Sequence, residues 1–68
     1  MNKYYEEYIK LDNGKWLFLK VNINVFDNKE QEKFCIKTKE KYGFIYKTYK
    51  YLNGRIEEKK YKFLGVAE

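Results

Sequence analysis

A chain of 68 residues with a formal net charge of +5 is long enough for one small domain, residues 1–68, but too short to enclose a deep catalytic cleft. It contains no His, no Ser and one cysteine, Cys35, so the sequence predicts neither an enzyme nor a bound metal or cofactor. Nucleophilic catalysis needs a nucleophile with a base beside it, and a zinc site needs several Cys or His ligands.

The positive charge is carried by the second half of the chain. Residues 1–32 contain five lysines and six acidic residues, whereas residues 33–68 contain nine lysines and Arg55 against four acidic residues. A one-sided positive field attracts polyanions. The sequence therefore points to nucleic acid or an acidic protein surface as the partner.

The composition also bears on location. A lone cysteine cannot form an internal disulfide, which favours a reducing, cytoplasmic environment. No apolar run approaches the ~20 residues of a membrane span, so we expect no membrane contact.

Turn signals divide the first part of the chain into two strand-like segments. Residues 3–11 precede Asn13-Gly14, and the following segment alternates apolar with other residues. This period of two predicts a half-buried strand, whose core row would be Leu17, Leu19, Val21, Ile23 and Val25. If Asn13-Gly14 forms a two-residue loop, Glu7 faces Lys20; a three-residue loop with a bulge at Gly14 would shift the register and separate that charge pair.

Residues 27–43 fit two structures. Asp27 to Glu30 has the form of a helix capping box, and Gly43 could end a helix. A strand is favoured because it places its apolar and polar side chains on separate faces, with Phe34, Ile36 and Thr38 on one side and Cys35, Lys37 and Lys39 on the other.

Residues 44–64 have the pattern of a β-hairpin closed by Asn53-Gly54, a pair suited to a type I′ turn. A two-residue loop would put Phe44, Tyr46, Tyr61 and Phe63 on one face, which we assign to the core. On the other face Lys47 would lie opposite Lys60, beside Tyr49. Like charges across a strand pair repel, and an anionic partner would relieve that repulsion.

The sequence therefore predicts an all-β fold, a small five-stranded antiparallel meander or partly open barrel. The alternative is an α+β arrangement, ββαββ, with a helix within residues 27–42.

Tyr42-Gly43-Phe44-Ile45 resembles the core of the RNP1 motif of RNA-recognition and cold-shock domains, in which strand aromatics stack on bases. Glu40, Lys41 and Lys47 depart from that motif. The same four residues also fit a turn glycine beside core aromatics.

The expected function is that of a small basic binding module that contacts nucleic acid without strong sequence preference, through lysine charge and tyrosine stacking. The candidate binding residues are Lys37, Lys39, Lys41, Lys47, Tyr49, Tyr51, Arg55, Lys60 and Lys62. The alternative is a small inhibitor or adaptor, of the kind that mobile genetic elements encode, that binds another protein through a sheet face or edge. A homodimer through an open edge is a third option.

Overall fold

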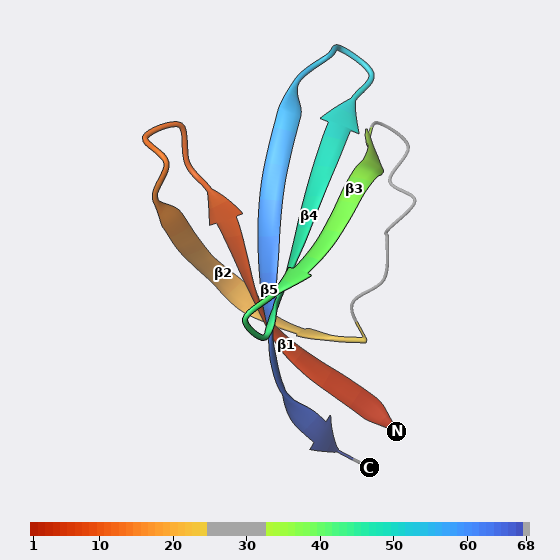
Figure 1. Cartoon of the computed structure of the whole chain (residues 1–68). Helices are drawn as coiled ribbons and strands as arrows, with labels where there is room; N and C mark the ends of the chain where they lie inside the picture. Colours follow the sequence, from red (N-terminus) through yellow and green to blue (C-terminus); the bar gives the residue numbers. More distant parts are fainter. Residues whose placement is uncertain (25–32, 68) are drawn as a thin grey trace.

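The computed structural model describes residues 1–24 and 33–67, which form a single antiparallel sheet of five strands (Figure 1). The strands are β1 (Asn2–Lys10), β2 (Trp16–Ile23), β3 (Lys33–Lys41), β4 (Phe44–Tyr51) and β5 (Ile56–Ala67). The all-β prediction is confirmed. The helix alternative is wrong for residues 33–42, which form β3 and the first position of the following turn, and its other residues, 27–32, lie outside the described part of the chain.

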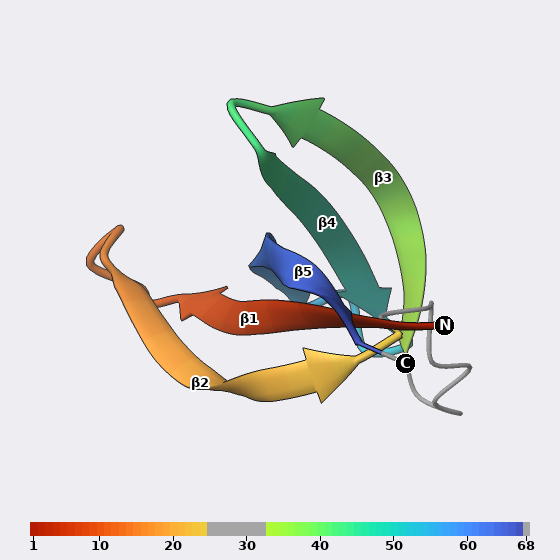
Figure 2. The ribbon, with the colours of Figure 1, turned by 90° about the horizontal axis from the view of Figure 1, so that it is seen from below.

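The strand order is β2-β1-β5-β4-β3. Consecutive strands β3, β4 and β5 form a meander, and β1 pairs antiparallel with β5, so the two terminal strands lie inside the sheet. The edges β2 and β3 do not pair, and the sheet is therefore open rather than closed into a barrel. Figure 2 shows that it is strongly twisted and curled.

Both Asn-Gly turns contain three loop residues instead of the predicted two. In the first, the Leu11 amide donates to the Lys15 carbonyl at 2.8 Å and the Gly14 amide to the Leu11 carbonyl at 2.9 Å; the second repeats this from Tyr51 to Arg55. Only the glycines have positive φ, +84° at Gly14 and +90° at Gly54. In this loop the asparagine does not adopt a left-handed backbone conformation. Its side-chain oxygen instead accepts a hydrogen bond from the backbone amide two residues later, at 2.9 Å in both turns.

The longer loop shifts the register of both hairpins. In β1–β2 a bulge at Leu19 corrects the shift, so the predicted Glu7–Lys20 pair survives, but nearer the turn Tyr8 faces Phe18 instead of Leu19. In β4–β5 no bulge intervenes, and Lys47 lies opposite Lys59 rather than Lys60. The predicted cross-strand pair of Lys47 and Lys60 is therefore wrong.

The core also differs from the expected one. Of the described residues, only Tyr49 and Tyr61, each 4% exposed, and Glu7, 5% exposed, are buried. The described members of the expected core row on β2 are 42–54% exposed, and Val25 lies outside the described residues. That row is exposed because β2 is an edge strand, and its bulge divides the row between two faces.

Candidate binding surface

The observed register places one group of aromatic and basic side chains on a single face, called here the aromatic–lysine face. It consists of Tyr8 on β1, Trp16 on β2, Phe44 and Tyr46 on β4, Lys60 and Lys62 on β5, and Lys37, Lys39 and Lys41 on β3. Within the described strands this face carries seven lysines, which also include Lys10 and Lys50, and two glutamates. Both glutamates are engaged: Glu6 accepts a hydrogen bond from Tyr8 at 3.1 Å, and Glu58 pairs with Lys10 at 3.1 Å.

Lys60 lies at the centre of this face, among three rings. Its Nζ is 4.8 Å from the ring centroid of Trp16, 4.9 Å from that of Phe44 and 5.2 Å from that of Tyr8. Each such contact contributes about 0.5–1 kcal/mol at an exposed site. The ammonium group thus holds together rings from three different strands.

The sheet curls toward the aromatic–lysine face at this point. The rings of Trp16 and Tyr46 meet edge to face, 5.9 Å apart, although β1 and β5 separate their strands. In a flat sheet, β2 and β4 would be three strand spacings, or roughly 14 Å, apart. The curl therefore converts separate aromatic residues into one continuous aromatic surface.

A bulge in β3 arranges the lysines beside these rings. The register shift between Cys35 and Lys37 leaves Ile36 as the extra residue, so Lys37, Lys39 and Lys41 share the aromatic–lysine face and Cys35 does not. Residues two apart on a strand are about 7 Å apart. The three lysines, with Tyr46, Thr48 and Glu58, line a shallow hollow of about 370 Å³.

The opposite face is held by largely buried ion pairs, whose side chains are 7–16% exposed. Lys59 lies 2.8 Å from Glu7 and 3.7 Å from Glu57, and Lys33 lies 3.4 Å from Glu57. The Asn22 amide also donates to Glu7, and the Tyr51 hydroxyl donates to Glu57. These hydrogen bonds meet the requirement that buried charges be paired.

The ion pairs and the burial on this face shift the pKa values of Glu57 and Tyr61. Although burial works in the other direction, the hydrogen bond from Tyr51 and the charges of Lys33 and Lys59 lower the pKa of Glu57. Burial, followed by the hydrogen bond with Tyr49, raises the pKa of Tyr61 well above its ordinary value. Glu57 thus remains ionised and Tyr61 neutral at neutral pH.

The sequence-based candidates divide between the two faces. Lys37, Lys39, Lys41, Lys60 and Lys62 lie together on the aromatic–lysine face, whereas Lys47, Tyr49, Tyr51 and Arg55 lie on the ion-pair side of β4 and its turn.

Neither expected stacking tyrosine is well placed. Tyr49 is buried, with Lys33 Nζ 4.9 Å from its ring centroid, and Arg55 already covers the Tyr51 ring at 4.1 Å.

Four aromatic residues on the aromatic–lysine face were missed from the sequence: Tyr8, Trp16, Phe44 and Tyr46. Phe44 and Tyr46 were assigned to the core with Tyr61 and Phe63, but the observed register pairs them with Lys62 and Lys60. A three-residue loop at Asn53-Gly54 is the signal that would have found Phe44 and Tyr46.

Cys35 is half-buried, with its Sγ 3.3 Å from the Lys37 carbonyl oxygen and 3.5 Å from the Thr38 hydroxyl. Within residues 1–24 and 33–67, no three His, Cys, Asp or Glu side chains gather as a metal site would require. The same residues contain no helix that could cross a membrane. The absence of enzymatic activity stays a prediction.

The RNP1 resemblance ends at the β3–β4 turn. Tyr42 and Gly43 are the two residues of that turn, with φ of +52° and +79°, so they lie outside the strands. Comparison with protein-family models, with curated proteins and with solved structures finds no match to this chain.

Proposed function

We propose that the aromatic–lysine face binds single-stranded nucleic acid without strong sequence preference. The observation that carries the proposal is the continuous curved surface in which the rings of Trp16, Phe44 and Tyr46 adjoin the lysines of β3 and β5. Surfaces of this kind bind single strands because phosphates are neutralised by cations while bases stack on rings.

The type of cation supports weak sequence preference. The face contains seven lysines in the described strands and no arginine. A lysine ammonium is a compact point charge, whereas base reading relies mostly on the planar, bidentate fork of arginine. Lysines along β3 would contact phosphates regardless of the bases between them.

Fluorescence anisotropy with labelled 12-nucleotide strands of different sequence, in 50 mM salt, tests the proposal. The double variant Lys39→Gln/Lys41→Gln removes two charges from the hollow, and we expect weaker binding of every strand. Lys20→Gln is the matched control, because Lys20 is exposed on edge strand β2 and faces the other side of the sheet. An intact protein that binds no strand at low salt would disprove the function.

A second proposal, contact with a protein partner, is favoured by the outer strand β2. Leu17, Phe18, Leu19, Val21 and Ile23 are each 42–54% exposed in this strand, whose outer edge pairs with none of the other described strands. Contiguous exposed apolar residues at an edge are typical of interaction surfaces. Sedimentation velocity detects self-association, and pull-down after nuclease treatment detects another protein. Val21→Lys should abolish both self-association and binding of another protein at this edge, since a charged edge residue opposes strand pairing.

A further inference from the structure

The β3–β4 turn contains a residue that the turn itself does not favour. Tyr42 has φ of +52° and is 87% exposed. Positive φ at the first position of such a turn is readily adopted by Asn, Asp or Gly, whereas a bulky side chain there is an outlier. Tyr42 therefore keeps a large ring in solvent at a position where a smaller residue would suit the backbone better.

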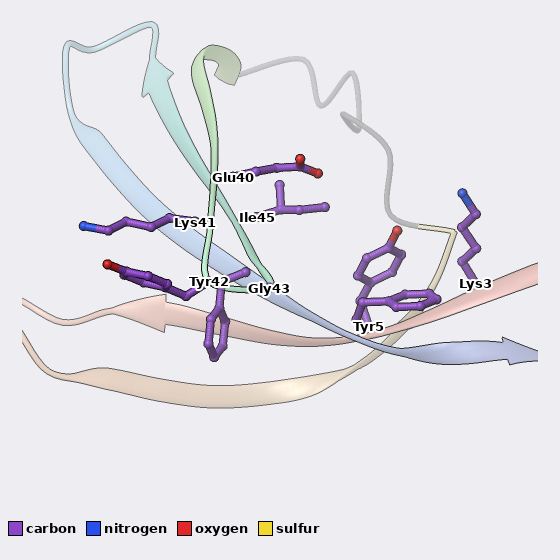
Figure 3. Close-up of a pocket in the computed structure, with 9 residues that line it drawn as sticks. Lys3, Tyr5, Glu40, Lys41, Tyr42, Gly43 and Ile45 are labelled. Atoms are coloured by element: carbon purple, nitrogen blue, oxygen red, sulfur yellow. The ribbon is translucent and has the colours of Figure 1, made fainter.

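The ring lies at the end of the lysine row. Lys41 Nζ is 5.2 Å from the Tyr42 ring centroid, and Phe44, which follows the turn, lies on the aromatic–lysine face. Figure 3 shows the Lys41 and Tyr42 side chains extending side by side, while Glu40 and Ile45 extend to the other side of the hairpin. The ring thus prolongs the proposed binding face past the end of the sheet.

We propose that Tyr42 stacks on an unpaired nucleobase and so makes the surface prefer single strands over duplexes. The inference rests on the proposed function and adds to it a stacking residue and a preference for single strands over duplexes. Local strain of this kind gathers at binding sites, and a base–aromatic stack is sequence-tolerant because every base has a π-face. In a duplex the bases are already stacked on one another. An exposed ring therefore finds no free base face to stack on along the duplex.

The decisive variant is Tyr42→Asn, because Asn readily adopts the positive φ of this turn position, so we expect the variant to keep the fold. We expect it to weaken binding of a 12-nucleotide single strand by about fivefold or more, with duplex affinity unchanged. Tyr42→Phe, which keeps the ring and loses the hydroxyl, should bind like the wild type. The salt dependence of binding should be the same in all three proteins, since no charge changes.

Two results would overturn the inference while leaving the proposed function intact. One is a Tyr42→Asn variant that binds single strands as tightly as the wild type; the other is an equal loss for single strands and duplexes. A folded wild-type protein that binds no single strand would overturn both, and this measurement comes first. Circular dichroism on each variant verifies that the fold is retained.

Discussion

Replacing Lys39 with Gln should reduce the salt dependence of oligonucleotide binding by a fixed amount. Each phosphate that a cation neutralises on a single strand contributes about −0.7 to the slope of log K against log salt. Four exposed lysines of the aromatic–lysine face are expected to contact phosphates: Lys37, Lys39, Lys41 and Lys62. Lys10 is left out because it pairs with Glu58, and Lys50 because it lies opposite Ile56, next to the Asn53-Gly54 turn and away from the central rings. Lys60 is left out of this count because its Nζ lies against three rings.

Four contacts give a slope of about −2.8, so affinity should fall roughly 50-fold between 50 and 200 mM salt. With Lys39→Gln the slope becomes about −2.1, and the fall over the same range is roughly 20-fold. Anisotropy titrations at four or five salt concentrations resolve this difference. The Lys20→Gln control should keep the wild-type slope.

The reasoning fails if the wild-type slope is near zero, because binding would then not depend on phosphates. It also fails if Lys20→Gln lowers the slope as much as Lys39→Gln, since the charge would then act through the whole molecule and not through one face. A slope much steeper than −2.8 would show that further lysines, such as Lys50 and Lys60 or those of the opposite face, also contact the strand.

The remaining predictions concern stability. Tyr42→Asn should raise the melting temperature measured by circular dichroism by roughly 4–8 °C. Removing the backbone strain of a bulky residue in the left-handed conformation should stabilise the fold by about 1 kcal/mol. Glu7→Ala should destabilise the fold by about 3 kcal/mol in urea unfolding, at the low end for a broken buried pair, because Lys59 loses its 2.8 Å partner but keeps Glu57 at 3.7 Å; a loss under 1 kcal/mol would contradict the importance of the pair. The pKa of Glu57 is lower in the folded protein than its ordinary 4.5, so its ionised form stabilises the fold above about pH 4.5, and this contribution is lost as the pH falls through the folded pKa. Acid titration of Glu57→Gln should therefore show a shallower loss of stability than the wild type, and identical curves would refute the assignment.

The sequence was sufficient to predict the strands but not their faces. Turn residues and period-two alternation located all five strands. Three bulges then broke the alternation, and the extra residues are Leu19, Ile36 and Leu64. Because each extra residue moves the following side chains to the other face, alternation read straight through a bulge assigns them wrongly.

The core was mispredicted for a different reason. Hydrophobicity selected β2, but burial in a single open sheet depends on position in the strand order. Tyr61 on β5 and Glu7 on β1 are buried because their strands have a neighbour on each side, whereas β2 has only one. Strand order follows from which segments pair over long distances, and local pattern carries no information about the β1–β5 pairing.

The ion pairs of the opposite face help to explain how the aromatic–lysine face becomes so positive. The described strands contain few glutamates, and Glu7 and Glu57 are committed to Lys59 and Lys33 on the ion-pair side. Glu40 also faces the ion-pair side, opposite Ile45, so only Glu6 and Glu58 offset the seven lysines on the aromatic–lysine face. The same register that buries charge on one side therefore gathers lysines and rings on the other, which is the combination that a single-stranded polyanion requires.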